Sequence, residues 1–87
     1  MTAMRLVMLS ESARLFMEGS LRKDEEKIHD IIYHFLARKR RPLIEDNGIV
    51  RLEENRFKMA MVKFSIFFYL DEKDTLHIVE IKKNPCN

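Results

Sequence analysis

This sequence contains few of the residues that interrupt regular secondary structure. Its 87 residues include two glycines and two prolines, and this scarcity disfavours a loop-rich all-β domain and favours long elements joined by short connections. It also contains a single cysteine, Cys86. One cysteine cannot form an intrachain disulfide, which is typical of a protein in the reducing cytoplasm.

Long hydrophobic runs are absent as well. The longest uncharged apolar run, Phe64–Leu70, has seven residues, whereas a membrane helix needs about twenty. Arg5 interrupts the apolar N-terminal stretch, and no small-residue cleavage signature follows it. We therefore expect a soluble, cytoplasmic protein with no membrane partner.

Length and charge balance limit the class of protein further. A chain of 87 residues has room for one domain, residues 1–87, and little room for both a core and a deep pocket, which disfavours a cofactor-dependent metabolic enzyme. Sixteen Lys and Arg against fourteen Asp and Glu give a formal net charge of +2, with 46% hydrophobic residues. This composition indicates a globular rather than a disordered chain.

The N-terminal part predicts a strand followed by a short helix. Met4–Leu9 is a short, mostly apolar run that ends at a serine, as a strand of a sheet does. Ser10 or Ser12 is a suitable N-cap for the helix. Gly19 is a suitable residue at its end, because glycine tolerates positive φ.

The clearest helical signal is Asp24–Arg41. Apolar residues recur in it with the spacing of one helix face: Ile28, Ile31, Ile32, Phe35 and Leu36. Acidic residues crowd its first turn and Arg38–Arg41 its last, which matches both ends of the helix dipole. Pro42 then ends the predicted helix.

From Ile49 onward the pattern changes to β. Arg56–Met59 alternates charged and apolar side chains, as a half-buried strand does, whereas Phe64–Leu70 is apolar at nearly every position and predicts a central strand covered on both faces. Thr75–Ile81 predicts a further strand. The turn Ala60–Lys63 lacks the Gly or Asn of a tight hairpin, which leaves the strand register open.

The order of these elements predicts an α+β fold. It consists of a strand, two antiparallel helices and a three-stranded antiparallel meander, with the helices on one side of the sheet.

Basic residues of the predicted sheet form the first candidate site. Arg56 and Lys58 are two residues apart on one strand and so project to the same face. Together with Lys63, Lys82 and Lys83 from neighbouring segments, they predict a cationic surface suited to a phosphodiester or another target. An ordinary solvent-facing strand surface is the alternative interpretation.

The end of the long helix is the second candidate site, a partner-binding patch of four adjacent cations: Arg38, Lys39, Arg40 and Arg41. These side chains are suited to phosphates or to an acidic partner segment. They equally satisfy the last carbonyls of a helix and solubilise its end. The sequence leaves both interpretations open.

Metal and nucleophilic chemistry are not supported. His29 and His34 are five residues apart, which places them about 140° apart around a helix, so they do not converge on one ion. His77 stands alone on the last strand, and Cys86 has no second thiol. The serines lie in no nucleophile motif, and there is no glycine-rich phosphate loop. We therefore expect no metal site and no cofactor.

Four segments of the C-terminal half carry a resemblance to a known family: Arg51-Leu52, Arg56–Met59, Phe64–Glu72 and Leu76–Lys83. The family pattern is a Lys-Leu pair, a short basic strand, an aromatic strand that ends in an acidic turn, and a last strand that ends in basic residues. With the preceding strand and two helices, the chain resembles the RelE/ParE superfamily of small bacterial toxins.

The resemblance implies a toxin that is neutralised by a cognate antitoxin protein. In ribosome-dependent ribonucleases of this family, basic strand residues hold the messenger RNA while a ribose 2′-OH attacks its own phosphate. By position, Arg56 and Lys58 match the paired basic residues of the second strand, and Lys82 or Lys83 those of the last. The ParE-like branch acts on DNA gyrase instead.

Two departures from the family pattern weaken the expectation of RNA cleavage. Ser65 occupies the position that usually holds an arginine, and the tail Asn84–Asn87 has no tyrosine. Loss of one preorganised charge near a reacting group typically costs about 10²–10³ in rate. The resemblance therefore leaves enzymatic activity open, with a non-catalytic module that binds protein or nucleic acid on the same scaffold as the alternative.

Overall fold

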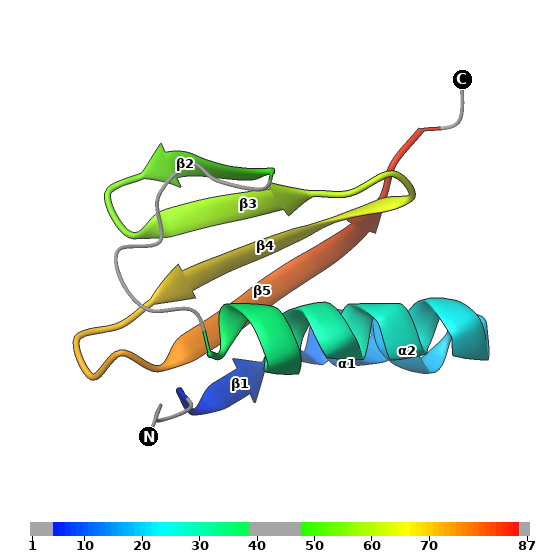
Figure 1. Cartoon of the computed structure of the whole chain (residues 1–87), viewed down its shortest axis with the longest axis horizontal. Coiled ribbons are helices and arrows are strands. Elements are labelled where there is room, and N and C mark those ends of the chain that lie inside the picture. Colours follow the sequence, from blue (N-terminus) through cyan, green and yellow to red (C-terminus); the bar gives the residue numbers. More distant parts are fainter. Residues whose placement is uncertain (1–4, 39–47, 86–87) are drawn as a thin grey trace.

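The computed structural model describes residues 5–38 and 48–85. In chain order the elements are β1 (Val7–Leu9), α1 (Glu11–Glu18), α2 (Arg22–Asp30), the π-helix η1 (Ile31–Leu36), β2 (Ile49–Glu53), β3 (Arg56–Ala60), β4 (Phe64–Leu70) and β5 (Leu76–Lys83). The strands form one sheet in the order β1-β5-β4-β3-β2, in which β1 is parallel to β5 and every other pair is antiparallel (Figure 1). The predicted α+β class is confirmed.

The meander has four strands in the described residues, not the predicted three, because β2 precedes the others. Gly48 immediately precedes this strand and has φ 85°, a backbone conformation that L side chains rarely adopt. A Cβ at Gly48 would lie 2.9 Å from the carbonyl oxygen of Ala60. The amide of Ala60 donates a hydrogen bond to the carbonyl oxygen of Gly48. Because it has no side chain, Gly48 can approach the backbone of Ala60 closely, and β2 can then pair with β3 at the edge of the sheet.

The short helix α1 has the predicted cap. The Ser10 hydroxyl oxygen accepts a hydrogen bond from the amide of Ala13, and the Ser10 amide donates to Ile78 on β5. Gly19 follows the last helical residue as predicted, but its φ is −88°, so positive φ is not the reason for a glycine at this position. The Gly19 amide donates to the carbonyl oxygen of Leu15.

The long helix begins at Arg22 and changes from α to π geometry at Ile31. Positions four residues apart overshoot one turn of an α-helix and fall short of one turn of a π-helix. The change therefore keeps Ile28, Ile32 and Leu36 on one line, and all three are fully buried. Within the described ranges, no helix combines the length and apolarity that a membrane crossing requires.

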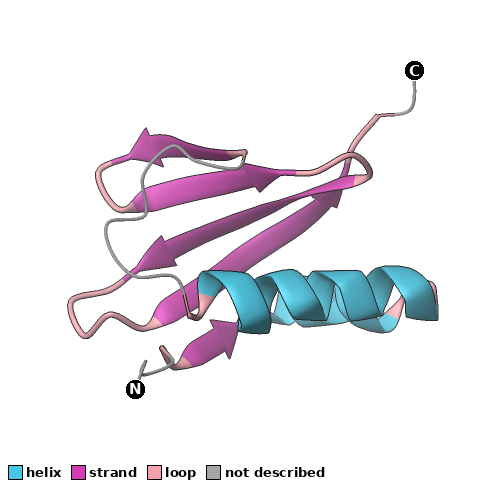
Figure 2. Cartoon of the chain, in the orientation of Figure 1, coloured by secondary structure: helices cyan, strands magenta, loops and turns pink. Residues whose placement is uncertain are grey.

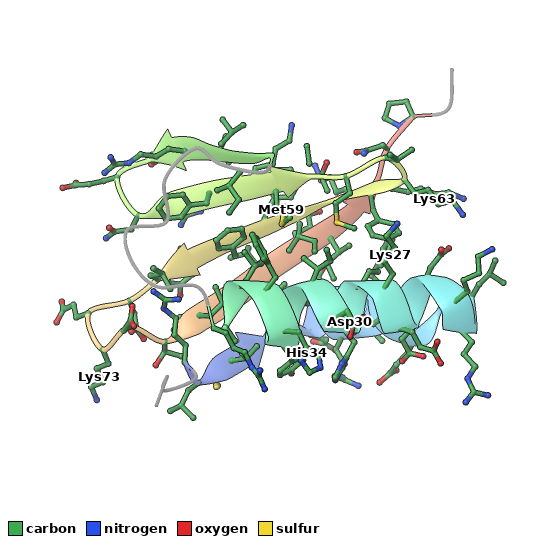
Figure 3. The ribbon with its side chains drawn as sticks, viewed as in Figure 1. Lys27, Asp30, His34, Met59, Lys63 and Lys73 are labelled. Atoms are coloured by element: carbon green, nitrogen blue, oxygen red, sulfur yellow. The ribbon has the colours of Figure 1, made fainter. Side chains whose placement is uncertain are left out.

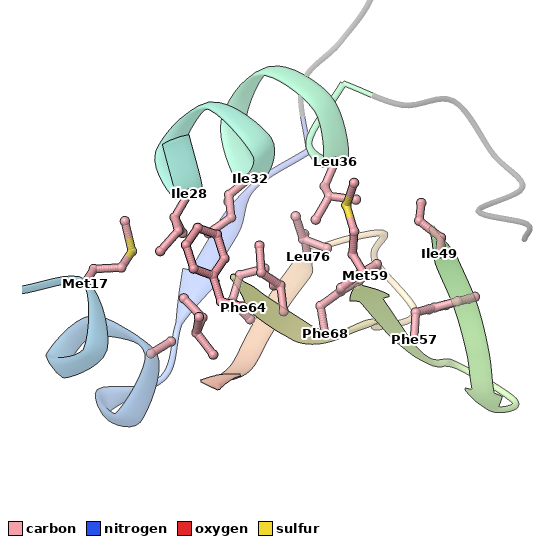
Figure 4. Close-up of a cluster of buried hydrophobic side chains, with 14 residues drawn as sticks. Met17, Ile28, Ile32, Leu36, Ile49, Phe57, Met59, Phe64, Phe68 and Leu76 are labelled. Atoms are coloured by element: carbon pink, nitrogen blue, oxygen red, sulfur yellow. The ribbon is translucent and has the colours of Figure 1, made fainter. Parts of the chain in front are cut away.

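The buried side chains lie between the helices and one face of the sheet (Figure 4). Phe64, Ile66 and Phe68 of the central strand β4 face this core. The helices cover only that face, and α1 packs against β5 and β1 (Figure 2). The prediction that β4 is covered on both faces is therefore wrong. Its other face carries Phe67 and Tyr69, which are half-buried.

An ion pair joins the strand layer to the end of the helical layer. The Nε atom of the buried Arg5 lies 3.0 Å from Oδ1 of Asp74, and Nη1 of Arg5 donates to the carbonyl oxygen of Leu36. Asp74 adopts φ 64° in the β4–β5 turn. Arg5 thus connects the N-terminal segment, the end of η1 and this turn.

A candidate nucleic-acid interface on the open face of the sheet

The sheet surface opposite the helices, which we call the open face, combines cations with rings. Cross-strand pairing places Arg56 opposite Tyr69 and Lys58 opposite Phe67. Pairing of β4 with β5 places Ser65 opposite Lys82 and Tyr69 opposite His77. Because side chains alternate between the faces of a strand, these residues share one surface. The open face is therefore defined by Arg56, Lys58, Ser65, Phe67, Tyr69, His77, Glu80 and Lys82.

Phe67 lies between two lysines. The Nζ atoms of Lys58 and Lys82 are 6.0 Å and 5.7 Å from the centroid of its ring. A cation at this distance is attracted by the negative face of an aromatic ring. Glu80 pairs with Phe67 across the strands and places one carboxylate on the same surface. The Phe67 side chain is half-buried, so part of its ring stays exposed on this face of the sheet.

Tyr69 is the second ring of the open face. The Arg56 guanidinium carbon is 5.8 Å from the Tyr69 ring centroid. On the other side, the His77 ring stacks on Tyr69 with 4.6 Å between centroids and 4° between planes. A row of Arg56, Tyr69 and His77 therefore crosses three neighbouring strands.

His77 has an acidic partner in the turn before β5. Its Nε2 atom is 2.8 Å from Oδ2 of Asp71, and Oδ1 of Asp71 accepts hydrogen bonds from the amides of Lys73 and Thr75. The hydrogen bond from His77, followed by the one from Thr75, lowers the pKa of Asp71 below its ordinary value. His77, which has no second histidine or cysteine beside it on the last strand, therefore has a carboxylate partner in the turn. No sequence signal marked this pair, because the turn geometry brings the two residues together.

The other histidines lie elsewhere. His29 stacks on Tyr33 with 4.4 Å between ring centroids, and His34 Nε2 lies 3.8 Å from Oδ1 of Asp30. In residues 5–38 and 48–85, no three His, Cys, Asp or Glu side chains gather as metal ligands do. Cys86 lies outside the described residues.

Ser65 has a structural partner. Its hydroxyl donates a 2.8 Å hydrogen bond to Oδ1 of Asn84, and Nδ2 of Asn84 donates to the carbonyl oxygen of Met61. The backbone amide of Asn84 donates a hydrogen bond to the carbonyl oxygen of Lys63. Asn84 therefore supplies hydrogen bonds to the β3–β4 turn, which explains how this turn forms without Gly or Asn. Ser65 is 4% exposed and holds Asn84 in place.

Of the five predicted sheet cations, the structure brings three together. Arg56, Lys58 and Lys82 lie on the open face, whereas Lys63 lies 3.7 Å from Asp24 of α2. Lys83 pairs with the core-facing Phe64 and so lies on the helix side of the sheet. Figure 3 shows Lys63 at the end of the molecule where Lys27 of α2 also lies.

Little of the predicted partner-binding patch falls within the described residues. Arg38 is exposed in the turn after η1. Lys39, Arg40, Arg41 and Pro42 lie outside the described residues. A partner-binding role of these four cations remains a prediction.

The similarity of this chain to known proteins lies in its structure rather than in its sequence. No protein-family model and no curated protein sequence matches the chain. A chain of the toxin–antitoxin complex RelBE2 from Mycobacterium tuberculosis has a similar structure, with a TM-score of 0.75 and 14% sequence identity. The match covers 94% of this chain and 100% of that chain. The predicted RelE/ParE-like fold is therefore confirmed.

Proposed function

We propose that this chain, which has a RelE/ParE-like fold, is the toxin component of a toxin–antitoxin system and is neutralised by an antitoxin protein. Its proposed action is to block translation in the cytoplasm by binding messenger RNA on the open face. The supporting observation is the arrangement of Arg56, Lys58 and Lys82 around Phe67 and Tyr69.

This surface has the two properties that single-stranded RNA requires. Its cations neutralise successive phosphates, and each phosphate contact makes the affinity more sensitive to salt. Its rings provide faces and edges against which unpaired bases pack, a contact worth about 1–3 kcal/mol per base. Double-stranded nucleic acid offers no such unpaired bases. The open face is therefore better suited to a messenger than to a duplex.

The proposed mode of action is occupation of the messenger rather than rapid cleavage. The resemblance implies an arginine at the position of Ser65, but the Ser65 hydroxyl is engaged by Asn84 and nearly buried. Efficient cleavage needs charge placed where negative charge develops on the phosphate. With Ser65 committed to the β3–β4 turn, binding by the remaining cations is the activity that the site supports best.

Induced expression of the chain alone in a bacterium tests this proposal. We expect growth arrest and loss of protein synthesis in a cell-free translation extract. The triple variant Arg56→Ala, Lys58→Ala and Lys82→Ala is expected to relieve both effects. A matched control, Arg14→Ala with Arg22→Ala and Lys73→Ala, removes the same charge from exposed positions off this face and is expected to remain toxic.

Three results would reject the proposal or redirect it. Normal growth together with an unaffected extract would reject a toxin role. Inhibition of gyrase supercoiling with translation intact would move the target from the messenger to gyrase. Equal toxicity of both triple variants would show that the open face is not the acting surface.

A non-catalytic binding module on the same scaffold is the second candidate, and the Ser65–Asn84 hydrogen bond favours it. Growth arrest on induced expression separates the two candidates, because a binding module is not expected to be toxic. Ser65→Arg in a messenger-cleavage assay tests whether the site is a cleavage site that lacks this arginine, with Ser65→Ala as the control for loss of the hydroxyl. No gain in cleavage by the arginine variant is expected. A large gain over both the native chain and Ser65→Ala would show a cleavage site that lacks only this charge.

A further inference from the structure

One end of the molecule exposes aliphatic side chains on two neighbouring turns. Leu15 of α1 and Leu21 of the α1–α2 turn are 54% and 73% exposed, and Val62 of the β3–β4 turn is 93% exposed. Figure 1 shows both turns at the same end of the long axis. The other large hydrophobic side chains that the described residues expose lie on or next to the edge strands β1 and β2: Leu6, Met8, Val50 and Leu52. Apolar surface concentrated at one end is typical of an interaction site.

Two hollows on the helix side connect these turns. The first, of about 380 Å³, is lined by Leu15 and Leu21. The second, of about 300 Å³, is lined by Val62. Asp24 and Phe64 line both hollows. The exposed aliphatic side chains therefore belong to one continuous surface.

Lysines surround this surface. Lys23 and Lys27 come from α2, Lys63 from the β3–β4 turn and Lys83 from β5. Figure 3 shows Lys27 and Lys63 at this end of the molecule. Among the described lining residues, Asp24 is the one carboxylate, and Lys63 lies 3.7 Å from it. The three aliphatic side chains and the four lysines together are called the basic end.

We propose that the basic end binds the surface of an anionic lipid bilayer. Leu21 and Val62 enter the apolar layer beneath the headgroups, while the lysines lie among the lipid phosphates. The strength of such binding grows with the apolar area that is buried and with the attraction of cations to anionic lipid. A protein in the cytoplasm meets a leaflet whose surface potential is negative. The basic end provides both contributions on one surface.

The shape of the basic end favours a bilayer over a folded protein partner. Leu21 and Val62 protrude from turns that are far apart in the sequence. A folded partner would need a separate recess for each of them, whereas a fluid lipid layer admits both without a matching shape. Lysine has a long flexible stem, so its ammonium group stays at the level of the headgroups when an aliphatic neighbour lies deeper.

Other occupants fit these features less well. The exposed lining side chains are aliphatic or charged, so an unpaired base of RNA finds no exposed ring on which to stack. A second copy of the chain docked through a two-fold axis would bring the lysines of both copies together, and like charges in contact oppose association. An anionic bilayer matches both the aliphatic side chains and the charge.

Surface binding requires no membrane-spanning helix. It therefore differs from the spanning contact that the short apolar runs of the sequence argue against. The open face also stays accessible, because Arg56 and Tyr69 pair at the end of β3 and β4 that is remote from the β3–β4 turn. The proposal does not depend on the toxin function.

Cosedimentation of the full-length chain with lipid vesicles tests the proposal. We expect binding to phosphatidylglycerol vesicles, and binding about tenfold weaker or less to neutral phosphatidylcholine vesicles, which lack the negative surface charge. Leu21→Ser is expected to weaken binding to phosphatidylglycerol about tenfold, since a leucine no longer enters the apolar layer. Leu52→Ser, at a 50% exposed leucine of β2, is the matched control and is expected to bind normally. Val62→Ser repeats the test if Leu21→Ser fails to fold.

A charge pair of variants tests the lysines separately. Lys27→Glu is expected to weaken binding to phosphatidylglycerol vesicles about tenfold at low salt and less at high salt, because salt screens the attraction. Lys73→Glu makes the same charge change in the exposed β4–β5 turn, away from the basic end (Figure 3). This control is expected to leave binding unchanged.

Fluorescence tests whether the aliphatic side chains enter the lipid. The native chain contains no tryptophan, so one introduced indole reports on a single position. In Val62→Trp, phosphatidylglycerol vesicles are expected to shift the emission to shorter wavelength and to protect the indole from an aqueous quencher. In Leu52→Trp, on β2, the vesicles are expected to change neither.

Several outcomes would overturn the proposal. They are no binding to phosphatidylglycerol vesicles at low salt, equal binding to neutral vesicles, binding that resists both Leu21→Ser and Lys27→Glu, and unchanged emission of Val62→Trp. Self-association that Leu21→Ser abolishes would assign the basic end to a second copy. Release from the vesicles by inorganic phosphate, but not by chloride at the same ionic strength, would assign the lysines to a free anion.

Growth arrest is a separate readout. Arrest without vesicle binding rejects only the lipid proposal, whereas vesicle binding without arrest rejects only the toxin function.

Discussion

The two faces of strand β4 use similar side chains for different purposes. On the helix side, Phe64, Ile66 and Phe68 are almost fully buried, whereas Phe67 and Tyr69 on the open face are only partly covered. The first set is covered by other apolar side chains, and the second is flanked by cations and His77. One seven-residue strand therefore contributes both a core and a binding surface, because its side chains alternate between faces.

The largest expected difference between the two faces of β4 is in how much a substitution on each face lowers the free energy of unfolding. Phe68→Ala is expected to lower the free energy of unfolding by about 3–5 kcal/mol, because it leaves a cavity in the core. Phe67→Ala is expected to lower it by about 1 kcal/mol, since part of that ring stays in water. Urea unfolding of the two variants measures both values. Equal losses would show that the two faces are not energetically distinct.

The Asn84 contacts at the end of β4 are expected to have an intermediate effect. Asn84→Ala removes hydrogen bonds to Ser65 and Met61, and the groups left without partners cost about 1–3 kcal/mol. Asn55→Ala, at an exposed position in the β2–β3 turn, is the matched control and is expected to be near neutral. Urea unfolding and amide exchange of Met61–Lys63 measure the loss. An unchanged variant would mean that the β3–β4 turn does not depend on Asn84.

A smaller effect is expected on the salt dependence of RNA binding. Lys58→Ala removes one cation from the open face and is expected to reduce the slope of log K against log salt by about 0.7, the value for one phosphate contact on a single strand. Lys73→Ala is the control and is expected to leave the slope unchanged. Fluorescence anisotropy with a single-stranded RNA across a salt series measures both. Equal slopes for both variants would exclude a phosphate contact at Lys58.

The smallest expected effect is a pH dependence at the edge of the open face. The pKa of Asp71 is lowered from 3.8, chiefly by the hydrogen bond from His77. The ionised Asp71 carboxylate therefore stabilises the folded chain at any pH above 3.8. This stabilisation is lost as the pH falls through the lower pKa that Asp71 has in the folded chain. Asp71→Asn removes this contribution. The difference in urea midpoint between the native chain and the variant is therefore expected to be constant near neutral pH and to shrink below about pH 4. A difference that grows on acidification would contradict this assignment.

Much of the fold could be predicted from residue spacing. The stripe Ile28, Ile32 and Leu36 marked the helix face that meets the sheet, and Ser10 marked the start of α1. Alternation in Arg56–Met59 correctly placed Arg56 and Lys58 opposite the core. These features depend on neighbours within a few residues along the chain, so the sequence carries them directly.

The composition of the candidate surfaces could not be predicted in the same way. Lys82 and Lys83 are adjacent in the sequence, yet pairing with Ser65 and Phe64 places them on opposite faces. Val79 adds one residue to β5 relative to β4, and this bulge sets which side chains of β5 share a face with Tyr69. A bulge depends on contacts between distant strands, so its position could not be read from β5 alone.

By itself, the sequence determined the first strand, the two helices and the strands β3, β4 and β5, together with the apolar helix face and the placement of Arg56 and Lys58 on one surface. These properties follow from local periodicity, capping and turn chemistry. Only the tertiary structure decided that Lys63 and Lys83 leave that surface for the helix side of the sheet, that Ser65 contacts the β3–β4 turn through Asn84, and that His77 pairs with Asp71. The physical reason is strand register. Side chains alternate between the two faces of a strand, so one added residue moves every following charge from one face of the sheet to the other.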